Sequence, residues 1–130
     1  NGAQSWGSFG AVLPQAGIPE LEKLLHIYAG SGLGKTSDLR VIEIVYFNME
    51  NAPPSPADLR EWNKHFHLHE RNIIVLGAPA QLVDEDAKGM VPGFQLVDRN
   101  FILRADATGS SPRSDLYKDL FPQIPKLLRQ

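Results

Sequence analysis

The sequence predicts an α/β fold in which a mixed sheet is flanked by helices. Leu39–Phe47 and Asn72–Leu76 are apolar runs rich in β-branched residues, as expected of strands buried on both faces. A helix-forming stretch separates them, and strands joined in this way pair in parallel through a right-handed crossover. Phe94–Val97 and Phe101–Arg104 are two more runs of β-forming residues, close enough together to predict an antiparallel hairpin.

The predicted helices are recognised by their ends. Pro19 suits the first turn of a helix that we expect to run to about Ala29, with leucines at helical spacing. Ser55 is placed to cap a second helix that begins at Pro56, and Ser114 to cap a last amphipathic helix.

Shorter features complete the prediction. Pro122 and Pro125 are expected to break or kink the last helix, because proline lacks the N–H that a helix interior needs. Asp98–Asn100 suits the turn of the hairpin, and residues 107–112 are expected to form a turn-rich link. One helical turn is expected at Asp84–Lys88. The element order is therefore helix, strand, helix, strand, hairpin and helix.

Length and composition limit the possible functions. The chain has 130 residues, 42% of them apolar and 22% charged, which indicates a single packed domain over residues 1–130. A formal charge of −2 without a basic cluster argues against nucleic acid as a partner. The apolar runs are far shorter than the roughly 20 residues that cross a bilayer. The sequence contains no cysteine, and it leaves localisation open.

Several stretches together resemble the thioredoxin-like superfamily, in particular its redoxin and thiol-disulfide reductase branch. The stretches are Ile18–Leu24, Val45–Asn48 and Val91–Arg99, and the resemblance covers nearly the whole chain. It implies a three-layer fold whose first strand is either absent or supplied by a longer parent chain. It also implies that Pro92 takes the place of the family's cis-proline beside the active site.

The resemblance does not extend to the catalytic thiols. Trp6–Gly10 lies where the family has its Trp-Cys-x-x-Cys loop, with glycines at both cysteine positions. The family's chemistry needs a thiolate, and Ser8 is a poor substitute because its hydroxyl has no base identifiable from the sequence. We therefore expect no catalytic residue, no cofactor and no metal in this region.

The sequence favours a redox-inactive thioredoxin-like module that binds a protein or peptide. A glycine-rich loop with aromatic side chains, next to the start of a strand, leaves backbone groups available for an extended peptide. The predicted binding residues are Trp6, Gly7, Ser8, Phe9, Gly10, Val91 and Pro92. The alternative from the same family is an oxidoreductase domain whose cysteines are replaced or lie outside this chain, so that enzymatic activity stays an open question.

Nucleotide binding is a further alternative. Ala29–Thr36 fits a relaxed phosphate-loop pattern in which Lys35 reaches the phosphates. Such a loop joins a strand to a following helix, whereas here a predicted helix precedes it and a predicted strand follows. A glycine-rich connector is therefore the favoured interpretation.

Other polar groups favour structural roles. His65, His67 and His69 alternate as metal ligands in a strand could, but they fall at a predicted helix end, where exposed histidine is ordinary. Nothing in the sequence brings Glu43 and Glu50 together as a catalytic pair.

Overall fold

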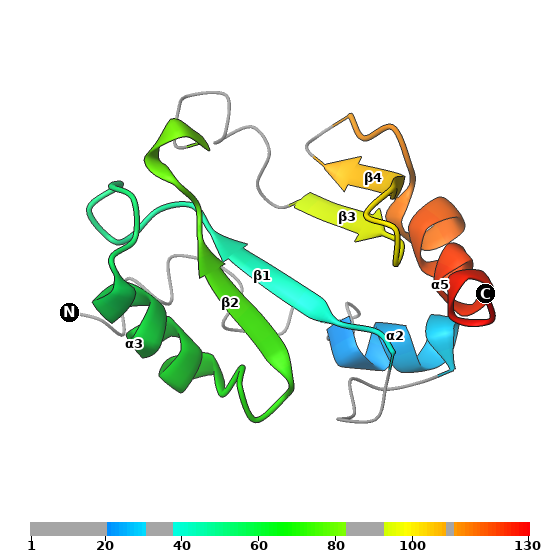
Figure 1. The fold of residues 1–130 in the computed structure, drawn as a ribbon, viewed down its shortest axis with the longest axis horizontal. Helices are drawn as coiled ribbons and strands as arrows, with labels where there is room; N and C mark the ends of the chain where they lie inside the picture. The colour runs from blue at the N-terminus through cyan, green and yellow to red at the C-terminus, as the bar shows by residue number, and fades with distance from the viewer. Residues whose placement is uncertain (1–20, 31–37, 83–92, 109–110) are drawn as a thin grey trace.

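The computed structural model describes residues 21–30, 38–82, 93–108 and 111–130. Its elements are α2 (Leu21–Ala29), β1 (Val41–Val45), α3 (Pro56–Phe66), β2 (Ile73–Gly77), β3 (Gly93–Val97), β4 (Leu103–Thr108) and α5 (Phe121–Leu128), with a 3-10 turn at Ala80–Leu82 and a π-helical turn at Leu116–Leu120 (Figure 1). This order confirms the α/β class. The helical turn predicted at Asp84–Lys88 lies outside the described residues.

β1 and β2 form the parallel pair that the sequence predicts, with α3 as the crossover between them. The register places Val41 beside Ile73 and Val45 beside Gly77. α3 lies against one face of the pair, where the indole Nε1 of Trp62 donates a hydrogen bond of 2.6 Å to Oε1 of Glu43. The helix and both strands therefore make one βαβ unit.

The start of α3 follows from its local sequence. Oγ of Ser55 accepts a hydrogen bond from the Asp58 N–H at 3.2 Å, and Oδ2 of Asp58 accepts one from the Ser55 N–H at 2.7 Å. This reciprocal capping box satisfies N–H groups that the first turn leaves without partners, and Pro56 follows it in the first turn. The helix ends at Phe66, after which His67 takes a left-handed conformation with φ of 53°. Both predicted features of the N-terminus are confirmed.

The hairpin of β3 and β4 is present, but its second strand lies further along the chain than expected. The prediction that Phe101 and Ile102 belong to the strand is wrong, because β4 begins at Leu103. β4 continues to Thr108, so the link expected at 107–112 begins later. The strands are antiparallel, with Gln95 beside Asp106.

Hydrogen bonds to Asp98 explain this shift. Its Oδ1 accepts from the N–H groups of Asn100 at 2.8 Å and Ile102 at 3.0 Å, and its backbone carbonyl accepts from Phe101 at 2.9 Å. The Asx-type turn thus takes up the residues as far as Ile102 and holds Phe101 at a φ of 60°. The β propensity of Phe101 and Ile102 predicts a strand, but the hydrogen bonds to Asp98 hold both residues in the turn.

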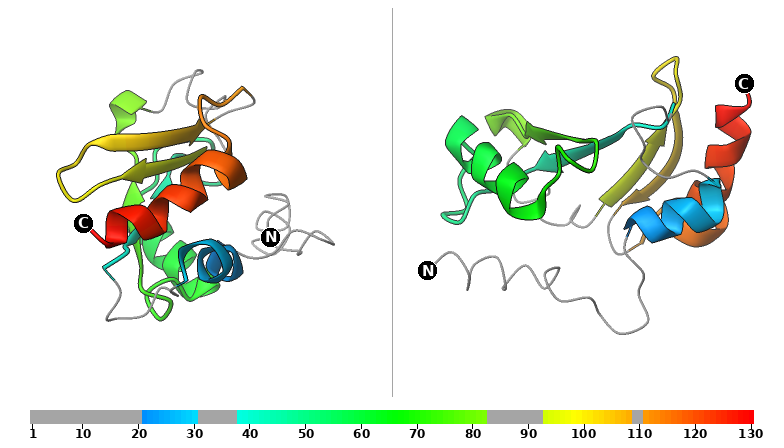
Figure 2. Two further views of the ribbon diagram at one scale, coloured as in Figure 1. Left: turned by 90° about the vertical axis from the view of Figure 1, so that its right-hand side faces the viewer. Right: turned by 90° about the horizontal axis from the view of Figure 1, so that it is seen from below.

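The core is centred on the contact between α2, α5 and the hairpin. Phe121 is 1% exposed and Ile124 3%, and both pack with Leu25 of α2 and Ala105 of β4 in one buried apolar cluster. The ring of Tyr28 stacks on Phe121 with centroids 5.6 Å apart. Figure 2 shows α2 and α5 lying next to each other on one side of the hairpin.

The last helical segment differs from the prediction at both ends. Its cap is Asp115, whose side chain accepts from the N–H groups of Tyr117 and Lys118, and not Ser114. Ser114 instead accepts a hydrogen bond from the backbone of Asp106, so its hydroxyl is used in holding the segment to β4. The π-helical turn gives way to α5 next to Pro122, where the sequence predicts a break or kink, whereas Pro125 does not break α5. Pro122 lies in the first turn of α5, and the helix continues through Pro125 to Leu128.

The strands do not form the single mixed sheet that the sequence predicts. In the described ranges β1 pairs with β2, β3 pairs with β4, and the result is two separate two-stranded sheets. Figure 1 shows β1 and β3 as the inner strands, with β2 and β4 outside them. No described strand lies between β1 and β3 to join the two pairs, and a three-layer thioredoxin-like arrangement is not established.

We expect Ser55→Ala to lower the free energy of unfolding by about 1 kcal/mol, because the substitution leaves first-turn N–H groups without their acceptor. Urea unfolding at pH 7 measures the change. The control is Ser55→Asn, which keeps a capping oxygen and should retain most of the stability. Equal stability of wild type and Ser55→Ala would show that the capping box does not stabilise the fold.

Acid should destabilise the hairpin turn. The hydrogen bond from the Ile102 N–H, with the Arg104 guanidinium, lowers the pKa of Asp98 below its ordinary value of 3.8. A carboxyl whose pKa is lower in the folded state stabilises that state above its unfolded pKa, and this contribution is lost as the pH falls through the folded pKa. We therefore expect stability to fall below about pH 4.

Unfolding curves measured between neutral pH and pH 2 test this expectation with Asp98→Asn. Asparagine keeps an acceptor for the turn but cannot ionise, so this variant should lose less stability on acidification than wild type. Identical acid dependence of the two proteins would contradict a role for the Asp98 charge.

Candidate binding surface

The residues that the sequence predicts for binding lie outside the part of the chain that the structure describes. They are Trp6, Gly7, Ser8, Phe9, Gly10, Val91 and Pro92. β3 begins at Gly93, directly after Pro92, close to the predicted strand start. The surface below consists of described residues that the sequence did not single out.

The flanks of the glycine-rich stretch agree with its interpretation as a connector. Ala29 is the last residue of α2, and Gly30 follows with φ of 66°, a conformation that glycine adopts without strain. Residues 31–37 lie outside the described residues, and β1 begins at Val41. A helix therefore precedes the stretch and a strand follows it, which is the reverse of the order that a phosphate loop requires.

The alternating histidines lie at the end of α3, as predicted. The ring of His65 packs edge-on against Phe66, with centroids 4.7 Å apart. Nδ1 of His67 lies 3.4 Å from Oε1 of Glu70, and the backbone N–H of His69 donates to Asn63. Within the described ranges, no group of three or more His, Asp or Glu side chains is arranged to hold a metal ion.

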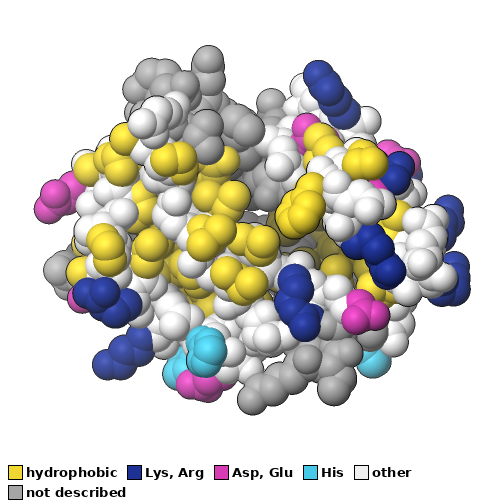
Figure 3. All heavy atoms as spheres, in the orientation of Figure 1, with side chains coloured by type: hydrophobic (Ala, Val, Ile, Leu, Met, Phe, Trp, Pro, Cys, Tyr) yellow, Lys and Arg dark blue, Asp and Glu magenta, His cyan; other side chains and the backbone are white. Residues whose placement is uncertain are grey.

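An exposed apolar surface lies on β1 and β2, on the face away from α3. Its side chains are Ile42, Ile44, Ile74 and Leu76, which are 53%, 48%, 46% and 47% exposed. The register places Ile42 beside Ile74 and Ile44 beside Leu76, so that the side chains form one continuous patch. Figure 3 shows hydrophobic side chains gathered over these strands. We call this patch the open face.

The two faces of the β1–β2 pair differ because, among the described elements, α3 covers only one of them. Alternate side chains of a strand point to opposite faces, and those opposite the open face, such as Val75, lie against the α3 side. The prediction of strands buried on both faces is therefore wrong for the open face. Parallel strands normally have both faces covered, so an apolar face left in solvent indicates a contact surface.

The open face carries no chemistry of its own. Its side chains are hydrocarbon and provide no proton donor, acceptor or metal ligand. The nearest carboxylate in β1 is that of Glu43, which lies on the opposite face and accepts the Trp62 hydrogen bond. Glu50 lies in the exposed turn after β1, so the two glutamates do not form a pair. The arrangement is suited to contact rather than to catalysis.

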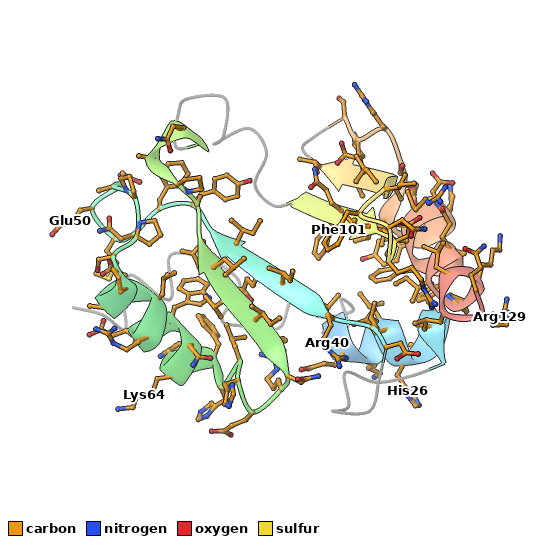
Figure 4. All side chains as sticks on the ribbon, in the orientation of Figure 1. His26, Arg40, Glu50, Lys64, Phe101 and Arg129 are labelled. Atoms are coloured by element: carbon orange, nitrogen blue, oxygen red, sulfur yellow. The ribbon has the colours of Figure 1, made fainter. Side chains whose placement is uncertain are left out.

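The hairpin turn carries a second exposed apolar group. Phe101, labelled in Figure 4, is 91% exposed, and Val97, Ile102 and Leu103 beside it are each about half exposed. Asp98 and its hydrogen bonds hold the turn, so Phe101 is presented on an ordered loop. The hairpin therefore adds an aromatic contact to the apolar surface of the molecule.

One hollow in the described surface is open, has a volume of about 230 Å³, and is lined by Arg104, Gln123, Lys126, Leu127 and Gln130. This volume is below the roughly 300–1,000 Å³ typical of small-molecule sites. Arg104, one of the two cations that line it, is already paired with Asp98 at 2.6 Å.

The comparisons with known proteins do not identify the chain. No family model, no curated protein and no solved structure matches it. In the described part of the molecule, no helix has the length and apolar character needed to cross a bilayer.

Neighbouring isoleucines of β2 test whether the open face is exposed in solution. Ile73 is 5% exposed and Ile74 is 46% exposed, on opposite faces of the same strand. We expect Ile73→Thr to cost about 2 kcal/mol or more, because it removes apolar contact and buries a hydroxyl. Ile74→Thr should stay within about 0.5 kcal/mol of wild type. Urea unfolding measures both, and a similar large loss in both variants would show that the open face is covered.

Proposed function

We propose that the chain is a redox-inactive thioredoxin-like module that binds a protein or peptide partner, and that the open face forms part of its binding surface. The observation that carries this proposal is a continuous apolar patch on ordered strands, composed of Ile42, Ile44, Ile74 and Leu76. A contiguous exposed apolar patch is typical of an interaction site, whereas apolar residues exposed singly are ordinary.

The absence of thiols supports a binding role over a redox one. The 130 residues include no cysteine, so the chain supplies neither an attacking thiolate nor a resolving thiol. The oxidoreductase alternative therefore needs cysteines from outside this sequence. A binding role does not require a cysteine.

The size of the open face indicates how strong the binding can be. Full burial of an isoleucine or leucine side chain is worth about 1.5–3 kcal/mol, and about half of each side chain here is still available. Covering the whole patch then yields about 3–6 kcal/mol, whereas a micromolar complex needs about 8 kcal/mol net. The patch must therefore act with further contacts, or the complex is weak and transient.

The shape of the surface favours a polypeptide over a small molecule. The patch lies on a two-stranded sheet, and the hollow beside Arg104 is open and smaller than usual ligand pockets. An extended or helical segment can cover side chains spread along two strands, because it meets several of them in succession. This supports a segment of another protein as the ligand.

To test the proposal, peptides that bind the immobilised chain are selected from a random displayed library, and their affinities are then measured by titration calorimetry. We expect the double variant Ile44→Thr, Leu76→Thr to bind the selected peptides at least about tenfold more weakly, equivalent to about 1.4 kcal/mol. The reason is that the two side chains lie next to each other on neighbouring strands of the patch.

The matched control is Lys64→Ala. Lys64 points away from β1 and β2 in Figure 4 and should leave the affinity unchanged. Peptides that bind the double variant as tightly as wild type would contradict a role for the open face. Circular dichroism of each variant shows whether it is folded.

A further inference from the structure

One end of the molecule combines exposed apolar side chains with a local excess of cations. In both views of Figure 2 the hairpin turn (yellow) and the end of α5 (red) project on the same side of the molecule. Arg104 of β4 and Lys126 of α5 line the same hollow, which joins the two segments. Residues 97–104 and 125–130 contain four cations and one carboxylate, a formal charge of +3, whereas the whole chain carries −2. We call these two segments the hairpin end.

The apolar part of the hairpin end is the turn itself. Phe101 is almost fully exposed, and Ile102 beside it is about half exposed. The N–H groups of Asn100, Phe101 and Ile102 all donate to Asp98, so none of them depends on water for a partner. A backbone N–H without a partner is costly outside water. The turn can therefore enter an apolar environment without leaving these three groups unsatisfied.

The cationic part is the hollow between β4 and α5. Arg104 donates to Oδ2 of Asp98 through Nε at 2.7 Å and through one terminal nitrogen at 2.6 Å, which fixes the guanidinium and leaves its other terminal nitrogen for a ligand. Within the described ranges, the ammonium of Lys126 has no carboxylate partner. None of the described lining residues is acidic, and the volume of about 230 Å³ is larger than a phosphate group. The hollow therefore suits an oxyanion.

We infer that the hairpin end binds the surface of an anionic phospholipid membrane. Phe101 and Ile102 enter the boundary between the headgroups and the acyl chains, and a lipid phosphate lies in the hollow between Arg104 and Lys126. The other cations of the hairpin end lie among the negatively charged headgroups. This role goes beyond the binding function of the open face and does not depend on it.

The combination of the turn and the hollow favours a lipid surface over a protein pocket. A bilayer accepts a protruding apolar turn without a preformed cavity of matching shape. It also presents phosphate groups at the level of the cations that flank the turn, because the headgroups lie directly outside the apolar boundary. One ligand thus accounts for both the exposed ring of Phe101 and the cationic hollow.

The chain itself offers no equivalent partner for the hairpin end. Two of the ranges outside the described residues join the hairpin at Gly93 and Thr108, a pair at the end of the strands opposite to the turn. The other two, residues 1–20 and 31–37, contain a single carboxylate between them, that of Glu20. They do not carry enough negative charge to balance the cations of the hairpin end.

Co-sedimentation of the full chain with lipid vesicles tests the inference. Vesicles of phosphatidylcholine rich in phosphatidylserine are compared with vesicles of phosphatidylcholine alone. We expect partitioning onto the anionic vesicles to be at least about tenfold stronger, because several cations act together at a negatively charged surface. High salt should remove most of this preference, since it screens the surface charge.

Two variants with matched controls assign the contact to the hairpin end. Phe101→Asn removes the ring and keeps the turn, because asparagine tolerates the left-handed conformation of this residue. It should weaken partitioning at least about tenfold, whereas Ile74→Thr on the open face should partition as wild type does. Lys126→Gln should weaken partitioning onto anionic vesicles about fivefold, and Lys64→Gln on α3 should not change it.

A third variant, Phe101→Trp, reports whether the turn enters the bilayer. After subtraction of the wild-type signal, its fluorescence should shift to shorter wavelength on anionic vesicles and be quenched by lipids brominated on their acyl chains. Circular dichroism shows whether each variant is folded. If Phe101→Asn does not fold, quenching of Phe101→Trp and the result for Lys126→Gln still decide the matter.

Several results would overturn the inference. These are equal partitioning onto both kinds of vesicle or onto neither, an equal loss in Ile74→Thr and Phe101→Asn, and a lack of quenching in Phe101→Trp. Displacement of the protein from vesicles by soluble glycerophosphoserine would show that the headgroup alone is recognised, without insertion of the turn. A concentration-dependent dimer that Phe101→Asn abolishes, in a protein that does not bind vesicles, would assign the turn to contact between copies of the chain.

Discussion

The hydrogen bonding of strand edges is the constraint on which this structure depends. Each strand described here pairs on one side only, and a two-stranded sheet is marginal in water unless another element packs on it. α3 provides that packing for β1 and β2, and α2 and α5 provide it for the hairpin, where Phe121 and Leu25 are nearly inaccessible to solvent. Stability therefore comes from helices on the covered faces. The inner strand edges and the open face are left for other contacts.

The polar contacts are concentrated at the ends of elements, where backbone groups lack regular partners. Ser55 and Asp58 cap α3, Asp98 holds the hairpin turn, and Asp115 caps the π-helical turn. The same hydrogen bonds lower the pKa values of these aspartates, with the Ser55 N–H acting on Asp58 and the Lys118 N–H on Asp115. Because each carboxylate accepts backbone N–H groups in the folded state, its negative charge favours folding. The hydrogen bonds that fix the ends of these elements therefore also make the stability of the fold sensitive to acid.

Local signals in the sequence predicted local structure well. Ser55 followed by Pro56 identified the start of α3, and the β-branched runs identified β1 and β2. The boundary of β4 and the cap at Asp115 were missed, because in each case competition between neighbouring hydrogen-bonding groups decides the outcome. The open face could not be predicted either. Ile42 and Val41 are equally apolar, so the sequence alone does not reveal which face α3 covers. The predicted site, Trp6–Gly10 with Val91 and Pro92, lies outside the described residues and stays a prediction.

Ile42 and Ile44 place their side chains on the open face and their backbone groups on the edge of β1 that does not pair with β2. In a strand, a residue whose backbone groups point to one edge has its side chain fixed on one face, so Ile42 and Ile44 contribute to both surfaces at once. A ligand that pairs with their backbone therefore brings its own side chains alongside theirs, and gains apolar contact together with hydrogen bonds. A ligand that covers the face alone gains only the first, which is too little for a tight complex. Extended polypeptide is the ligand class that provides both contacts with a single repeating geometry, which supports a polypeptide as the partner of the open face.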